Sequence, residues 1–213
     1  SFTEFQKAIN FSMTSYMTTG GIRGGKIPIE NYEPRSFNMG ISKEAFQATG
    51  GFGRIHPGED PDLSIRLKEM GYHLHLIPEA FVFHKRRINL ESFYTQVNKF
   101  GQARPILNKW HPQSKRLTYW FPTFFTLGLL LSSVLSILGF HWFLIVYGLY
   151  FLAAMIGAFR TSNNIIVAFL VFPAIVIQFF GYGFGFLKAT LKLGLSSKNE
   201  TQLFPKLFFR AND

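Results

Sequence analysis

The chain has 213 residues, a net charge of +10 and no cysteine, so neither a disulfide nor a thiolate metal site can form within it. This length fits one domain, or one domain with an attached segment. The basic residues crowd beside long apolar runs, which favours lipid headgroups as their partners and argues against nucleic acid.

Residues 1–19 carry apolar side chains at spacings of three and four, which predicts a helix. The glycine-rich segment TTGGIRGGK (18–26) follows and predicts a loop. Two interpretations stay open for it. It is either a plain surface loop or a loop that approaches a ligand, with Arg23 and Lys26 contacting phosphate or sugar.

The segment RSFNMGISKEAFQATGGF (35–52) predicts a short extended piece, a turn at 38–40 and then a helix. Ser42 precedes good first-turn residues and is the expected N-cap. Gly50 and Gly51 are expected to end this helix.

Three acids stand at the start of the next helical pattern, in HPGEDPDLSIRLKEMGYHLHLIPEAFVFH (56–84). Asp60 precedes a proline and is the expected N-cap, while Asp62 lies in the first turn and can pair with Arg66. An Asp-X-Asp metal site is rejected, because that motif normally ends a hydrophobic strand. Residues 72–77 and 80–84 have the pattern of strands. Local chemistry leaves open whether the acids cap the helix or act on a ligand.

The segment 90–102 has an apolar stripe and a polar opposite side, which predicts an amphipathic helix. Such a helix can pack on a soluble core. Its position directly before a long apolar run instead favours a helix that lies on the membrane surface.

Three apolar runs predict membrane-spanning helices at about 119–138, 141–159 and 164–187, because about 20 apolar residues cross the hydrocarbon core. The basic residues before the first run are expected to keep the preceding domain cytoplasmic. Three crossings place the C-terminal tail outside. That tail is itself basic, so this arrangement conflicts with the same charge rule.

Residues 35–87 taken together resemble family 2 glycosyltransferases of the GT-A fold. The resemblance rests on FNMGISKEAFQATGGF, GEDPDLSIRLKEMGY and LIPEAFVFHKRR, in this order and spacing. It implies an α/β fold, the acceptor-side half of a GT-A domain, at 1–88. An interfacial helix and basic linker (89–116), an all-α transmembrane region (117–187) and a basic tail (188–213) would follow. The nucleotide-binding half would lie upstream, and the chain alone would be inactive.

Carried over by position, the family's acid pair falls on Glu59 and Asp60, with Asp60 as general base, and a metal-holding histidine falls on His84. The family's sugar-pocket loop and the turn beneath its acceptor fall on Asn38, Met39 and Gly40, and on Gly50, Gly51 and Phe52. The implied cofactor is a divalent cation, Mg²⁺ or Mn²⁺, held mainly by the upstream half.

The implied function is inverting transfer of a sugar from a nucleotide-sugar to a lipid-linked or glycan acceptor in envelope polysaccharide or glycolipid synthesis. The enzyme would lie in the bacterial inner membrane, in contact with its lipids, with the catalytic domain cytoplasmic. Processive members carry Gln-x-x-Arg-Trp before the membrane. Gln102, Arg104 and Trp110 are spaced differently here, which favours single-sugar transfer. The alternative is a non-catalytic membrane-anchoring or scaffold subunit whose acids serve only as caps.

Overall fold

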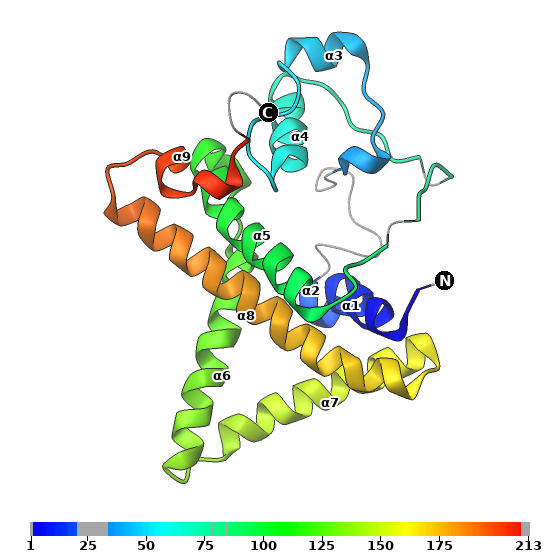
Figure 1. The fold of residues 1–213 in the computed structure, drawn as a ribbon, viewed down its shortest axis with the longest axis vertical. Coiled ribbons are helices and arrows are strands. Elements are labelled where there is room, and N and C mark those ends of the chain that lie inside the picture. The colour runs from blue at the N-terminus through cyan, green and yellow to red at the C-terminus, as the bar shows by residue number, and fades with distance from the viewer. Residues whose placement is uncertain (1, 21–33, 78, 84, 210–213) are drawn as a thin grey trace.

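The computed structural model describes residues 2–20, 34–77, 79–83 and 85–209 (Figure 1). The α-helices of these residues are, in chain order, α1 (Glu4–Thr14), α2 (Tyr16–Thr19), α3 (Lys43–Ala48), α4 (Glu59–Glu69), α5 (Leu90–Trp110), α6 (Phe121–Ile137), α7 (Trp142–Ser162), α8 (Ile165–Leu195) and α9 (Glu200–Leu203). Short 3₁₀ turns lie between them: η2 (Ser36–Asn38), η3 (Pro112–Ser114), η4 (Leu117–Trp120) and η5 (Pro205–Leu207).

The predicted α/β fold is wrong for this chain. Within the described residues there is no strand or sheet, and the only extended pairing is an isolated antiparallel bridge between Ile55 and Phe208. Residues 72–77 and 80–83, which have the strand pattern, run without regular structure. A strand persists only when a neighbouring strand satisfies its backbone groups, and no described segment forms a ladder with either of these.

The predicted caps have different outcomes. Ser42 caps α3 as expected, and its side chain accepts from the Ala45 N–H. The prediction that Asp60 is an N-cap is wrong, because α4 begins one residue earlier, at Glu59. Gly58 takes the cap position with φ 134°, a backbone conformation that favours glycine. The side chain of Asp60 is therefore not used in capping its own helix.

Three helices are long and apolar enough to cross a membrane, as predicted. They span Leu117–Ile137, Trp142–Ser162 and Ile165–Leu195. The third is longer than the sequence pattern indicates, at 31 residues. Its length of about 46 Å exceeds the thickness of the hydrocarbon core. Length and composition indicate that the chain is associated with a membrane.

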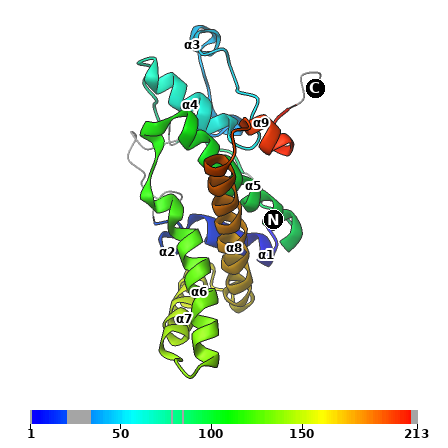
Figure 2. The ribbon, with the colours of Figure 1, turned by 90° about the vertical axis from the view of Figure 1, so that its left-hand side faces the viewer.

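Helix α8 is the central element, because α1, α5, α6 and α7 all pack against it. Figure 1 shows α6 and α7 as two sides of a triangle whose third side is α8. In the view of Figure 2, the start of α5 lies on the other side of α8 from α6 and α7, and α5 then crosses α8 toward its own end. The largest core cluster joins these helices, and Phe93 and Phe179 are fully buried within it. Phe93, expected on a membrane-facing stripe, is thus covered by protein.

Helices α5 and α8 approach so closely that their contact requires glycine. A Cβ atom added at Gly101 would lie 2.2 Å from the Tyr182 carbonyl oxygen, and one added at Gly185 would lie 2.4 Å from the Asn98 carbonyl oxygen. The Asn98 side chain also donates to the Gly181 carbonyl oxygen at 2.9 Å. Backbone contact at this distance fixes the register between the two helices.

We expect Gly101→Ala to destabilise the protein, because the new methyl group must push α8 away from α5. The loss should be about 1–3 kcal/mol, the range of overpacking substitutions. Gly148→Ala in α7 is the matched control, since nothing lies within 4 Å of its added Cβ. Chemical unfolding of the purified protein in detergent tests this; equal stability of the two variants would contradict the close contact.

Candidate active site

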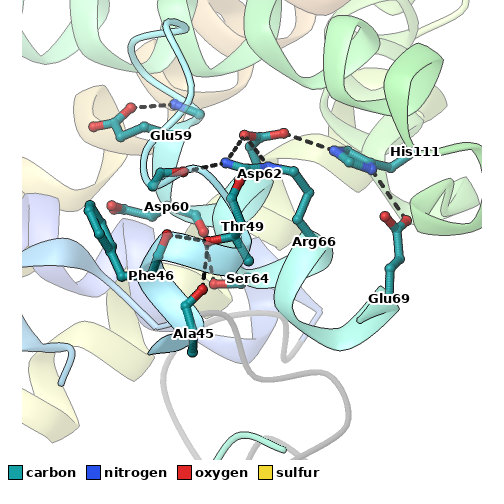
Figure 3. Close-up of polar contacts among 12 residues, drawn as sticks. Ala45, Phe46, Thr49, Glu59, Asp60, Asp62, Ser64, Arg66, Glu69 and His111 are labelled. Carbon is teal, nitrogen blue, oxygen red and sulfur yellow. Dashed lines mark hydrogen bonds and ion pairs between the residues drawn. The ribbon is translucent and has the colours of Figure 1, made fainter. Parts of the chain in front are cut away.

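The first turn of α4 carries the three predicted acids, and the structure places them in three different environments. Asp62 is 5% exposed and lies between Arg66 and His111 (Figure 3). Its Oδ2 accepts from Arg66 Nε at 3.1 Å and Nη2 at 2.7 Å, which confirms the predicted pairing. Its Oδ1 lies 2.9 Å from Nε2 of His111. Both oxygens of Asp62 are therefore occupied by protein.

Arg66 and His111, the two partners of Asp62, each make further contacts. Arg66 also donates to the carbonyl oxygens of Thr49 and Gly51, which ties α4 to the end of α3. His111, at the end of α5, has its Nδ1 3.3 Å from Glu69 Oε1. A buried carboxylate with this set of partners holds α3, α4 and α5 together, which is a structural role.

Glu59 is held at the start of α4. Its Oε1 lies 2.9 Å from Nδ1 of His56, and its Oε2 accepts from the Gly58 N–H at 2.8 Å. The carboxylate of Glu59 therefore fixes the loop before the helix while still lining the large cavity next to α4.

Asp60 is the acid that remains available. It is 9% exposed, and within the described residues its Oδ1 is buried with no hydrogen-bond partner. Burial raises the pKa of Asp60 above its ordinary value of 3.8, and the nearby Glu59 adds to the rise. Hydrogen bonds from Ser36 and the charge of Arg35 oppose it. A buried carboxyl with a free oxygen and a raised pKa is a candidate proton acceptor.

Asp60 lines a cavity of about 1150 Å³ that lies between the α4 region and the apolar helices. The α4 side contributes Ser36, His56, Gly58, Glu59, Asp60 and Pro61, and the side of the apolar helices contributes Phe121, Pro122, Phe124, Tyr150, Gln178 and Tyr182. Gln178 Oε1 is also buried without a hydrogen-bond partner among the described residues. The cavity thus joins a polar end to an aromatic and apolar wall.

The basic side chains around the cavity are arginines. Arg35, Arg86, Arg87, Arg104 and Arg116 line it. Burial lowers the pKa of Arg86, and the charge of Arg35 contributes to this shift. Two guanidinium groups that repel one another in the cavity lined by Asp60 form a site suited to an anion such as phosphate.

The remaining predicted site residues lie elsewhere. Asn38 donates to the Ala80 carbonyl oxygen at 3.2 Å, and Met39 packs on the small core of α3 and α4. Gly50 and Gly51 both have φ 73° and end α3, as predicted. None of Asn38, Met39, Gly40, Gly50, Gly51 and Phe52 is among the residues that line the cavity. Their contact with a substrate stays a prediction.

The last three predicted residues, Arg23, Lys26 and His84, lie outside the described residues. Elsewhere, among the residues that are described, no group of three His, Asp or Glu side chains could hold a metal ion. Sequence reasoning missed Arg35 and His111. Arg35 lies close in sequence to the predicted sugar-pocket loop at 38–40, so its position could have drawn attention to it. No local pattern links His111 to Asp62, which lies 49 residues earlier.

Comparison with known proteins gives one family match and one curated relative. The model of the family described as "Glycosyl transferase family group 2" matches residues 37–180, which confirms the resemblance found in the sequence. The succinoglycan biosynthesis protein ExoA of Rhizobium meliloti (strain 1021) is 26% identical over 104 residues. This match covers 48% of the chain but only 32% of that relative. No solved structure matches.

We expect Asp62→Asn to destabilise the protein by about 2–3 kcal/mol, because a neutral amide cannot accept from both Arg66 and His111. Glu44→Gln is the matched control, an exposed acid in the first turn of α3. Its loss should stay below about 1 kcal/mol. Denaturant unfolding measures both, and an Asp62→Asn variant as stable as the control would refute the structural role of Asp62.

Proposed function

The chain belongs to glycosyl transferase family group 2, and on this premise we propose that it supplies the acceptor-side catalytic acid of an inverting glycosyltransferase. The donor is a nucleotide-sugar, and the acceptor is a lipid-linked sugar used in envelope polysaccharide synthesis. The likeness to a succinoglycan biosynthesis protein supports the polysaccharide assignment. The match covers about a third of that relative, and the proposal assigns donor binding to a part of the enzyme outside these residues.

The observation that carries this proposal is the position of Asp60 in the cavity. The cavity has one free, buried carboxyl on its polar side and the aromatic residues of α6 and α7 on the other. A lipid-linked acceptor has the matching chemistry, with hydroxyl groups and phosphate at one end and an apolar chain at the other. Phe121, Phe124 and Tyr150 would contact the apolar part.

The proposed step is a direct displacement at the anomeric carbon of the donor. The acceptor hydroxyl oxygen forms the new glycosidic bond while the bond to the diphosphate oxygen breaks. Asp60 accepts the hydroxyl proton, for which its buried oxygen without a partner is suited. The electron pair of the broken bond leaves on the nucleoside diphosphate. The glycosidic bond is made on the face opposite the leaving group, so the configuration inverts.

Arg35 and Arg86 would bind phosphate oxygens in this arrangement. The charge of Arg35 acts on both Asp60 and Arg86, and all three side chains line the cavity. A divalent ion, Mg²⁺ or Mn²⁺, would assist departure of the diphosphate as a Lewis acid. We propose that the donor-binding part of the enzyme would mainly hold this ion, and no step assigned to the described residues depends on it.

A membrane-anchoring scaffold is the second candidate, and the burial of Asp60 weighs against it. A buried carboxyl without a full set of partners is costly, and a protein that only anchors gains nothing from it. Asp62, by contrast, has the fully paired environment of a structural acid.

Asp60→Asn should separate these two candidates in the complete enzyme. We expect sugar transfer to fall by about 10²-fold or more, because the amide cannot accept the hydroxyl proton. Stability at neutral pH should be unchanged or higher, since the substitution removes a buried charge whose pKa is raised by burial. Transfer assays with thermal unfolding alongside test this. Full activity of Asp60→Asn would favour the scaffold.

The pH dependence of transfer should also report on Asp60. A base works only when deprotonated, so the acidic limb of kcat/KM should lie above 3.8, the ordinary value for aspartate. Hydrogen bonds from Ser36 hold this pKa down. Ser36→Ala removes the side-chain bond, and the acidic limb should move to higher pH. A limb that Ser36→Ala leaves in place, or moves to lower pH, would argue against Asp60 as the titrating base.

A further inference from the structure

The depth of α8 in the membrane can be deduced from the helix that lies beside it. Helices α5 and α8 run parallel and side by side. Leu90, at the start of α5, lines a small pocket with Leu170 and Pro173. Further along, Gly101 meets the backbone of Tyr182. Near the ends of both helices, Ala103 and Ile106 share a core cluster with Ala189. The two helices therefore stay together over most of the length of α5.

Helix α5 is unsuited to hydrocarbon. It has 21 residues, yet it is not among the helices apolar enough to cross a membrane. Glu91, Lys99 and Arg104 are distributed along it. A charged residue at the centre of a bilayer costs about 2.5–3.5 kcal/mol even on the lowest scale. If α8 crossed the membrane, α5 would have to cross with it.

Both ends of α5 also lie on the same side. Arg86 precedes the helix and Arg116 follows it, and both line the cavity that contains Asp60. A helix that crossed the membrane would separate these residues by the thickness of the bilayer. Helix α5 therefore runs along one surface, and α8 runs with it.

The segment after α8 returns to the α4 region. The His56 N–H donates to the Leu207 carbonyl oxygen at 2.7 Å, and the Phe209 N–H donates to the Arg54 carbonyl oxygen at 3.0 Å. Ile55 and Leu207 lie in one buried cluster. These backbone bonds require residues 54–56 and the C-terminal segment to lie on the same side of the membrane.

Helices α6 and α7, unlike α8, extend away from α5 and the α4 region. The start of α6 packs on α8, where a Cβ at Gly183 would lie 2.8 Å from the Pro122 carbonyl oxygen. Phe151 in α7 makes an edge-to-face contact with Phe172 of α8, with the ring centroids 4.8 Å apart. The turn between α6 and α7 lies far from α8 in Figure 1, and its Phe140 is exposed. The open end of this hairpin therefore meets α8, and its closed end points away.

We infer that α5 and α8 form a layer that lies in the plane of the bilayer surface and binds its headgroup region, and that only α6 and α7 cross. The crossing number is then two, and the C-terminal segment lies on the side of Asp60. The basic residues Lys109, Lys115, Arg116, Arg160, Lys188, Lys192, Lys198 and Lys206 all fall on this one side. Their shared position matches an anionic lipid surface and removes the charge conflict of three crossings.

Single cysteines test this topology directly, because the 213 residues contain none. Three exposed positions suffice: Lys115, Phe140 and Ser197. In sealed membrane vesicles of one orientation carrying the complete enzyme, a membrane-impermeant maleimide should label Lys115→Cys and Ser197→Cys from the same side. Phe140→Cys should react from the opposite side. Labelling of Ser197→Cys together with Phe140→Cys would establish three crossings and overturn the inference.

A depth measurement provides the second arm. Phe172 and Leu191 are both exposed and about 28 Å apart along α8. Spin labels at the two positions should report similar depths near the headgroup boundary if α8 lies in the plane. A label at Phe172 near the bilayer centre, with one at Leu191 in water, would show that α8 crosses. Neither the labelling nor the depth measurement depends on sugar transfer, so a negative result would contradict this topology without contradicting the proposed function.

Discussion

The close contact between α5 and α8 is the constraint on which the rest of the structure depends. Where Gly101 and Gly185 bring the two backbones together, no side chain separates them, so neither helix can slide or rotate without a clash. Helix α5 ends at Trp110, and His111 directly after it holds the buried Asp62 of α4. The position of α4 relative to the apolar helices is thus transmitted through α5. Without this contact, the carboxyl of Asp60 would have no fixed position relative to the aromatic residues of α6.

Asp60 and Asp62 show how one short turn places two carboxyl groups in different environments. The residues lie two positions apart in the same first turn and have the same side chain. Asp62 faces Arg66 and His111 and is fully paired, whereas Asp60 faces the cavity and keeps a buried oxygen free. The environment therefore separates a fully paired carboxylate from one with a free buried oxygen, and under the proposed function the second one is the base.

The sequence predicts the features that depend on residues close together in the chain. The Ser42 cap, the Asp62–Arg66 pair and the three apolar helices all follow from spacing or composition. What it misses depends on distant partners. The strand pattern after α4 is wrong because strand formation needs a neighbour that the described residues do not provide. The contact of His111 with Asp62 joins positions far apart in sequence. The cap of α4 is a local exception, because Gly58 takes that position instead of Asp60 through a backbone angle that only glycine readily adopts.

The position of the site at the membrane surface has a chemical reason under the proposed function. Arginines stand beside Asp60 and aromatic rings line the opposite wall, so the cavity suits a molecule whose two ends prefer different solvents. Such a molecule is already confined to the bilayer, and an active site held at the same depth meets it at a high effective concentration. A layer of α5 and α8 in the plane of the membrane surface holds the active site at this depth, whereas a bundle of spanning helices does not by itself fix it. It places the base where the polar head of the acceptor lies and lets the hairpin of α6 and α7 contact the apolar chain below.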